Sequence, residues 1–305
     1  MKLPRSKLAL VTAALVVPNL IVLSPAASPA HARPIAQQAG SANKKHFNDV
    51  ITAIPGLTHY YPLDVRHGIR DVWGGSGAKP DGHRNYLNLT NAGGVNFTTT
   101  GATFDGSPNA FLFARSSPDF SVTGTNAIAF LVAVTFPTYA QPSSFHWMSK
   151  GGSKRTNFEW ALRLYGDGNG ERDRGVSNYY WNPNPEKDVK GKTVPGARGS
   201  GAYLMPPEGN GTRHPNGPAG SGSPNKEHIF GFEFTYAGTH GYAGRCRLFY
   251  GSSTVPMKMI SDRAMNDDAP VTPKYTVGDL FIGKRGDNDG VVKAKIRRVA
   301  FFNRT

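Results

Sequence analysis

The sequence predicts an all-β protein that folds as a single antiparallel β-sandwich. Glycine (36) and proline (23) are abundant among its 305 residues, and no long segment shows the 3.6-residue period of an amphipathic helix. Runs of aromatic and β-branched residues are broken by Gly, Pro, Asn and Asp, which is typical of strands joined by turns. The chain also ends on such a run, and a terminal strand is kept in place by pairing within a sheet.

Strands are expected along most of the chain after a short helical segment around 47–54. The clearest are a central strand with two apolar faces at 127–136 and a hairpin formed by 228–236 and 245–251. The last stretch, 280–304, is also predicted to be a hairpin, because two apolar runs flank a Gly/Asp/Asn-rich turn. The other expected strands are 57–63, 87–89, 95–97, 102–107, 110–114, 145–149, 157–165, 175–182 and 201–205, whereas 256–273 is expected to be a connecting loop.

Residues 1–32 are predicted to be a secretory signal peptide. A basic start precedes the apolar run 8–23, and Ala30-His31-Ala32 forms a small-x-small cleavage pattern. Pro18 interrupts the run, which is also shorter than the roughly 20 residues of a membrane-spanning helix. We therefore expect a secreted, extracellular protein without a transmembrane segment after cleavage. Its expected parts are an N-terminal lead at 33–56 and one domain at 57–305, which contains a Gly/Pro-rich insertion at 166–228.

The charge and the single cysteine restrict the possible partners. Removal of residues 1–32 takes away three of the 35 basic residues and none of the 21 acidic ones, which leaves a formal charge of +11. A field of this sign attracts anionic polymers. For a secreted protein these are acidic polysaccharides, teichoic acids or membrane surfaces more readily than nucleic acid. Cys246 has no cysteine to pair with in the chain and is expected to be buried in a strand of a monomer.

Two stretches resemble laminin-G-like, concanavalin A-like sandwich domains. The closing strand keeps the frame Val292-x-Ala294-x-Ile296-x-x-Val299-x-Phe301-Phe302-Asn303-Arg304, and Phe104-Asp105-Gly106-Ser107 matches a second element of the family. The closing strand departs from the family at Arg297 and Arg298, where acidic residues are usual. The resemblance implies a jelly-roll sandwich with long Gly/Pro-rich loops over roughly 57–304.

The alternation in 157–165 indicates one buried face and one open face that could bind a ligand. The open face would carry an acid, a guanidinium and a phenol from Glu159, Arg163 and Tyr165. Flat aromatic rings stack on sugars, and arginines bind carboxylate or sulfate groups with two hydrogen bonds. The candidate ligand-binding residues are Trp73, Glu159, Arg163, Tyr165, Arg174, Tyr179 and Trp181.

Catalytic and metal sites are the alternatives to simple binding. A polysaccharide lyase would use His146 or Tyr165 as the base and Arg163 to neutralise a uronate. A glycoside hydrolase would need two carboxylates, and Glu159 and Glu233 are single acids on separate expected strands. A structural calcium ion would be held by Asp105, Asp287 and Asp289. No zinc motif, serine elbow or phosphate loop is present in the sequence.

The sequence thus predicts a secreted, non-catalytic, lectin-like domain that recognises an extracellular and anionic glycan. The first alternative is a lyase or hydrolase that acts on an acidic polysaccharide with the same concave face. The second alternative is a cell-surface interaction module.

Overall fold

The structure is a computed structural model in which the chain divides into two compact units, Met1–Pro34 and Ile35–Thr305. All described residues belong to the second unit, and the signal peptide predicted at 1–32 lies outside them. The described residues are 47–74, 86–121, 127–139, 143–151, 158–166, 175–180, 186–187, 193–194, 202–204, 225–235, 245–252, 256–264, 277–286 and 291–304. No helix within these ranges is long and apolar enough to cross a membrane.

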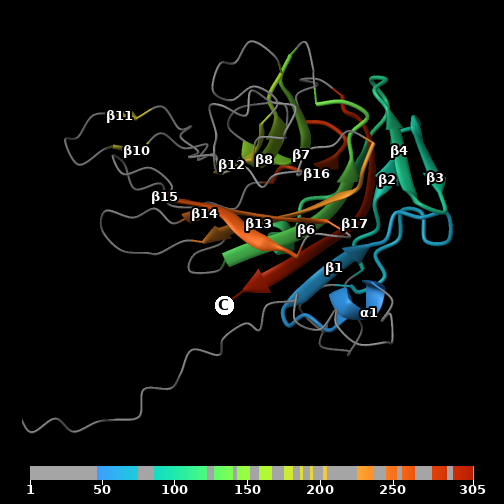
Figure 1. Cartoon of the computed structure of the whole chain (residues 1–305), viewed down its shortest axis with the longest axis horizontal. Coiled ribbons are helices and arrows are strands. Elements are labelled where there is room, and N and C mark those ends of the chain that lie inside the picture. The colour runs from blue at the N-terminus through green and yellow to red at the C-terminus, as the bar shows by residue number, and fades with distance from the viewer. Residues whose placement is uncertain are drawn as a thin grey trace, which may run out of the picture. The chain divides into compact units, whose positions relative to one another are not determined.

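The described residues form two large antiparallel sheets (Figure 1). The eight-stranded sheet has the order β15-β14-β13-β6-β17-β4-β3, and β1 also pairs with β17. Its strands are β1 (Leu57–Tyr61), β3 (Val95–Thr98), β4 (Gly101–Asp105), β6 (Ala127–Thr135), β13 (His228–Thr235), β14 (Arg245–Ser252), β15 (Lys258–Ala264) and β17 (Lys293–Arg304).

The seven-stranded sheet has the order β12-β9-β8-β7-β16-β5-β2. Its strands are β2 (Thr90–Asn91), β5 (Leu112–Ala114), β7 (Phe145–Gly151), β8 (Phe158–Leu164), β9 (Val176–Tyr180), β12 (Ala202–Leu204) and β16 (Leu280–Ile282). A separate pair is formed by β10 (Glu186–Lys187) and β11 (Thr193–Val194), and the described ranges also contain the short helix α1 (Phe47–Thr52) and the 3-10 helix η2 (Pro118–Phe120).

The main core lies between the two sheets, which confirms the predicted all-β sandwich. Phe130 of β6 stacks on Trp160 of β8 with ring centroids 4.8 Å apart, so side chains of the two sheets meet directly. Alternate residues of β6 enter this core, and β6 pairs with β13 on one side and β17 on the other. This confirms that 127–136 contains a central strand. Cys246 of β14 is fully buried in the same core, as its alternation with Leu248 predicted.

The predicted hairpin at 280–304 is wrong, because its two strands belong to different sheets. β16 lies between β5 and β7 in the seven-stranded sheet, whereas β17 lies between β4 and β6 in the eight-stranded sheet. A single bridge, Lys284 to Val291, is the only ladder contact described between the two arms. The backbone edges of β16 are taken by its two neighbours, so the chain passes from one layer to the other. The prediction that the C-terminal strand completes a large sheet is confirmed.

The segment 256–273, expected to be a loop, contains the edge strand β15. β15 pairs with β14 over Lys258–Ala264, and its polar composition suits an edge that faces solvent on one side. Ion pairs reinforce the pairing, because Asp262 Oδ1 lies 2.6 Å from Arg245 Nε and 3.4 Å from Arg247 Nε. The strand was missed because its residues lack the apolar alternation that identified its neighbours.

A second, smaller core covers part of the outer side of the eight-stranded sheet. Ile51 of α1 packs with Tyr60 of β1 and Phe302 of β17, and Trp73 lies against the same cluster. Figure 1 shows α1 beside β1. The helical turn expected around 47–54 is therefore present, and it anchors the start of the domain to the C-terminal strand.

Candidate functional site

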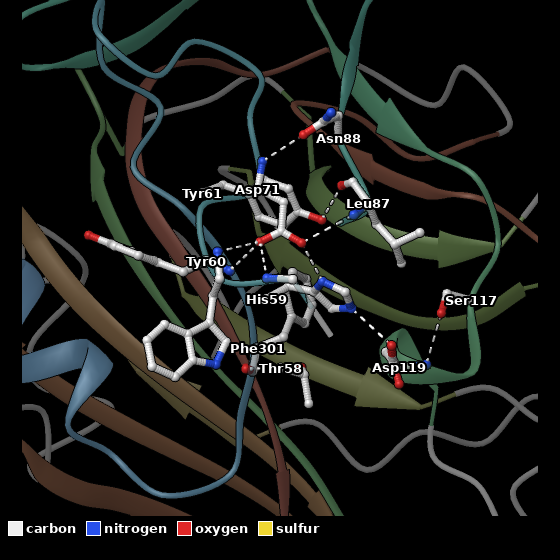
Figure 2. Close-up of polar contacts among 12 residues, drawn as sticks. Thr58, His59, Tyr60, Tyr61, Asp71, Leu87, Asn88, Ser117, Asp119 and Phe301 are labelled. Atoms are coloured by element: carbon white, nitrogen blue, oxygen red, sulfur yellow. Dashed lines mark hydrogen bonds and ion pairs between the residues drawn. The ribbon is translucent and has the colours of Figure 1, made fainter. Parts of the chain in front are cut away.

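A histidine held between two carboxylates lies where β1 meets η2. His59 Nδ1 is 2.6 Å from Asp71 Oδ2, and His59 Nε2 is 3.0 Å from Asp119 Oδ2 (Figure 2). The side chains of His59 and Asp71 are fully buried, while that of Asp119 is 21% exposed. The cluster therefore runs from the surface into the interior.

Asp71 is held as a carboxylate by the backbone around it. Its Oδ1 accepts hydrogen bonds from the N–H groups of Tyr60, Trp73 and Gly74, and its Oδ2 accepts one from Leu87 N–H in addition to the bond from His59. Burial alone would raise the pKa of Asp71, but His59 and these N–H groups hold it below its usual value. Burial would likewise lower the pKa of His59, but the hydrogen bonds to Asp119 and Asp71 raise it.

This arrangement stabilises a protonated imidazole and ties three segments together. A ring whose two nitrogens both donate to carboxylates cannot accept a proton, so His59 is poorly suited to act as a general base. It instead links β1 to the turn at 71–74 and to η2. Neither His59 nor Asp119 was a sequence candidate, because partners 12 and 60 residues apart leave no short motif.

Glu159, predicted to lie on an open face, is fully buried in an ion pair. Its Oε2 lies 3.0 Å from Lys150 Nζ and 3.1 Å from the donating Ser121 hydroxyl. The pairing of β7 with β8 shifts between Lys150 and Gly151, so Glu159 falls at an irregular point of the ladder. The carboxylate is therefore not available to a ligand in this arrangement.

The predicted open face of β8 is largely covered. Ala161 is fully buried and Tyr165 is 6% exposed, whereas Arg163 is half-buried. This face, which we call the outer face of the seven-stranded sheet, is the one turned away from the main core. Part of the cover comes from the segment after β16, because the Ser149 hydroxyl of β7 lies 3.5 Å from the backbone oxygen of Lys284.

Three of the predicted site residues do come together on this outer face. His146 of β7 is the register partner of Arg163 of β8, and the Arg163 guanidinium lies 4.6 Å from the centre of the Tyr165 ring. Burial lowers the pKa of His146 well below its usual 6.5, and the positive charges of Arg285 and Arg163 lower it further. The structure therefore joins a neutral imidazole, two guanidinium groups and a phenol ring.

An aromatic cluster that was not among the sequence candidates lies on the same outer face. Phe111, Phe113 of β5 and Phe281 of β16 have ring centroids 6.1 to 6.4 Å apart, and all three are half-buried. Lys284 Nζ lies 3.5 Å from the centre of the Phe111 ring. We call these four residues the phenylalanine platform. The available signal was that Leu280-Phe281-Ile282 is apolar on both faces, which one buried face does not require.

The remaining candidates are dispersed or lie outside the described residues. Trp73 donates to the Leu57 carbonyl from the small core, and Asp105 is exposed and accepts from Ser107 N–H within its own turn, as the Phe-Asp-Gly-Ser element predicted. Tyr179 lies in β9 opposite Ala161. The candidates outside the described residues are Arg174, Trp181, Asp287 and Asp289.

The two acids considered for a hydrolase do not come together, and the described residues contain no metal cluster. Glu159 and Glu233 belong to different sheets, and Glu233 Oε1 lies 3.0 Å from Arg247 Nη1 on the far side of the eight-stranded sheet. No group of three or more His, Cys, Asp or Glu side chains that could hold a metal ion occurs in the described part of the chain. The calcium site with Asp287 and Asp289 stays a prediction.

Comparison with known proteins gives a fold and no family. No protein family and no curated protein matches the chain. Among solved structures, it is similar to the botulinum neurotoxin serotype G binding domain, with 13% identity, a TM-score of 0.50, and coverage of 81% of this chain and 47% of that one.

Two further structures are more distant. One is the botulinum neurotoxin serotype D ligand binding domain in complex with N-acetylneuraminic acid, with 10% identity, a TM-score of 0.47 and coverage of 81% of this chain and 47% of that one. The other is Trypanosoma rangeli sialidase, with 10% identity, a TM-score of 0.41 and coverage of 82% and 30%. The chain spans about half the length of the neurotoxin domains. The serotype G match supports a β-sandwich and does not show the laminin-G-like family in particular.

Proposed function

We propose that this domain is a secreted, non-catalytic module that binds an anionic extracellular glycan on the outer face of the seven-stranded sheet. The observation that carries the proposal is the environment of Arg163. Its guanidinium lies over the Tyr165 ring, and its buried Nε has no hydrogen-bond partner among the described residues. An arginine in this state is suited to a carboxylate or sulfate group, which would accept hydrogen bonds from the planar guanidinium.

The charges around Arg163 support an anionic ligand. Arg285 lies close enough to affect the titration of His146, and Lys284 precedes it in the same segment. The carboxylate nearest in sequence on β8, Glu159, is neutralised by Lys150 in the interior. As far as the structure describes it, the outer face near Arg163 is therefore cationic, which agrees in sign with the net charge of the whole chain.

The phenylalanine platform supports a sugar as the remainder of the ligand. Phe113 and Phe281 are register partners, and Phe281 is followed across the sheet by Ser149 and Ala161. The rings and Arg163 thus lie on the same face, and the small residues between them are buried, with the segment after β16 against Ser149. Aromatic rings bind the apolar faces of sugar rings, while the cation would fix the position of an acidic substituent. The matched neurotoxin domain is itself named a binding domain, which fits a binding role for this sandwich.

One observation favours a lyase as the second candidate. The lowered pKa of His146 keeps its imidazole neutral at pH 7, as a general base requires. However, His146 is 2% exposed and Tyr165 is 6% exposed, so neither reaches a polymer without a rearrangement. Binding needs only the half-buried Arg163 and the platform, and is therefore the better-supported function.

The test measures retention on immobilised polygalacturonate, dextran sulfate and neutral dextran at low and high salt. Arg163→Gln should weaken binding to the two anionic polymers about tenfold, because one charge-assisted contact is lost. Phe281→Ala should weaken binding to all polymers that the wild type retains. The matched control is Lys258→Gln, which removes one exposed positive charge from the other sheet.

Three outcomes would decide between the functions. Equal losses in Arg163→Gln and Lys258→Gln would mean that only net charge matters, and the proposed site would be wrong. Unchanged binding in both Arg163→Gln and Phe281→Ala would also contradict it. The appearance of unsaturated uronate absorbance during incubation with polygalacturonate, and its loss in His146→Ala, would favour the lyase instead.

A further inference from the structure

A pocket of about 110 Å³ lies beside β17, and two consecutive arginines form part of its wall. Its lining includes Asp64, Thr99, Thr100, Arg297 and Arg298. These residues come from the segment after β1, from the β3–β4 turn and from β17, so the pocket belongs to the eight-stranded sheet. None of them was a sequence candidate for ligand binding, although the unusual charge of Arg297 and Arg298 was evident.

A bulge in β17 is what brings both arginines to the pocket. Ile296 and Val299 are both fully buried in the main core, and strict alternation would turn Arg298 toward that core as well. The register against β6 instead shifts between Arg297 and Ala300, and Arg298 adopts φ 57. The extra residue lets both arginines leave the core on the same side.

Backbone strain gathers around this pocket. Among the described residues, the non-glycine residues with positive φ are Leu63, Asn225 and Arg298. Leu63 precedes the lining residue Asp64, and Arg298 is itself a lining residue. Strained backbone conformations cost free energy and are retained mainly where a site needs them. Two of these three residues therefore lie in the wall of this pocket or directly before it, which supports a built site.

The charges of the pocket favour an anion. Arg297 contacts both oxygens of the Glu227 carboxylate, with Nη2 2.5 Å from Oε1 and Nε against Oε2, and Arg298 Nη1 lies 3.7 Å from Oε1. Asp64 Oδ1 accepts from His67 Nδ1 and from two backbone N–H groups, while the negative charge of Asp64 also acts on Arg298.

Lys295 extends the cationic side of the pocket. Its Nζ lies 3.2 Å from the Thr100 hydroxyl, so a third positive charge borders the β3–β4 turn. Burial lowers the pKa of both Arg297 and Arg298, and the neighbouring Arg298 lowers that of Arg297 further, whereas Tyr60 partly offsets the lowering at both and Asp64 that at Arg298. An added negative charge would relieve this repulsion.

We propose that this pocket binds a tetrahedral oxyanion, the sulfate or phosphate group of a larger ligand. Its volume accommodates several water molecules, which such a group would displace. Two guanidinium groups supply charged donors, and the threonine hydroxyls supply neutral ones. The site lies on the other sheet from the face in the proposed function and does not depend on it.

The experiment measures the thermal unfolding midpoint of the full chain against increasing sodium sulfate, sodium phosphate or sodium acetate, each compared with sodium chloride of equal ionic strength. The test variants are Arg298→Gly and Arg298→Asn, because both residues tolerate positive φ and remove the charge without adding strain. Both should be at least as stable as the wild type in chloride. Lys258→Gln again serves as the matched control for the loss of one charge.

Sulfate and phosphate should raise the midpoint of the wild type and of Lys258→Gln with a saturating dependence. The half-saturating concentration should be about tenfold higher in both Arg298 variants. Equal responses in all four proteins would show only the general stabilisation by excluded salts and would overturn the proposal. An equal response to acetate would overturn the tetrahedral preference.

Arg163→Gln separates this site from the glycan-binding proposal. It should keep the full sulfate response. If Arg163→Gln lost that response while the Arg298 variants kept it, the anion would bind on the other face, and the oxyanion pocket would be wrong without affecting the glycan proposal. If only the Arg298 variants lost the sulfate response, the oxyanion pocket would be supported, whatever the result of the polymer-binding experiment.

Discussion

His59 Nδ1 lies 2.6 Å from Asp71 Oδ2, and neither side chain is exposed to solvent. This contact joins the first strand of the sandwich to the turn at 71–74, and the second ring nitrogen joins it to Asp119. Since β1 pairs with the C-terminal strand β17, the contact also helps to hold the two ends of the described unit in one sheet.

The His59–Asp71 contact should make stability depend on pH in two directions. The pKa of His59 is raised in the folded state, so its stabilisation is complete below the usual pKa of 6.5 and is lost as pH rises through the folded value. The pKa of Asp71 is lowered, so its stabilisation is complete above 3.8 and is lost as pH falls through the folded value. The free energy of unfolding, from urea titrations at pH 3 to 9, should decline on both sides of this range.

Substitution of His59 separates its contribution to the alkaline decline in stability from the contribution of Asp71 to the acidic decline. His59→Gln should cost about 3 kcal/mol near pH 6, since it leaves the buried Asp71 carboxylate without its charged partner. It should also flatten the decline above pH 6.5. An unchanged alkaline limb in His59→Gln would mean that other groups cause it, and the role given to His59 would be wrong.

The buried pair Lys150–Glu159 should be costly to break and inexpensive to replace as a whole. Lys150→Met should lower the free energy of unfolding by about 3 to 5 kcal/mol, because it leaves an uncompensated buried carboxylate. Lys150→Met combined with Glu159→Gln should recover most of this loss, since Gln can still accept the hydrogen bond from Ser121. A double-mutant cycle measures the coupling, and additive single effects would contradict it.

Gly283 should be far less replaceable than Gly68, although both have positive φ. A Cβ at Gly283 would lie 2.5 Å from Phe104 Cδ1 in the core, whereas one at Gly68 would meet nothing within 4 Å. We expect Gly283→Ala to cost about 3 kcal/mol and Gly68→Ala about 1 kcal/mol in urea unfolding. Because Gly283 precedes Lys284, Gly283→Ala should also disturb the phenylalanine platform. Equal losses of unfolding free energy in the two variants would show that positive φ alone, and not the contact with Phe104, determines the cost.

The thiol of Cys246 should report global unfolding. The residue is fully buried in β14, between strands on both sides, so no local opening at an edge exposes it. The rate of its reaction with an aromatic disulfide reagent should follow the free energy of unfolding across urea concentrations. Fast labelling in the absence of urea would show that β14 and β15 open separately from the core.

The strands that could be predicted are those whose own residues alternate or are apolar on both sides. The stretch 127–136 and the pair 228–236 with 245–251 belong to this group, because burial between two sheets requires that composition. β15 could not be predicted in this way, since an edge strand that pairs through polar residues resembles a loop. The arms of 280–304 were recognised as strands, but their local pattern does not say which sheet each one joins.

The residues of the candidate sites also divide into those that could be predicted from the sequence and those that could not. Arg163, Tyr165 and His146 were grouped under the lyase alternative, and the register of β7 and β8 brings them together, while Glu159 was assigned to an open face and lies in the interior. The His59 cluster and the oxyanion pocket were not predicted at all. Their members are separated by tens to hundreds of residues, and no spacing rule connects them.

The sequence by itself determined that this chain is a basic, all-β sandwich with a buried lone cysteine, because periodicity and composition are local properties. Only the tertiary structure decided which strands share a sheet, that the outer face of β8 is mostly covered, and that a bulge turns both Arg297 and Arg298 out of the core. These features depend on hydrogen bonds and packing between distant segments, which no local pattern records.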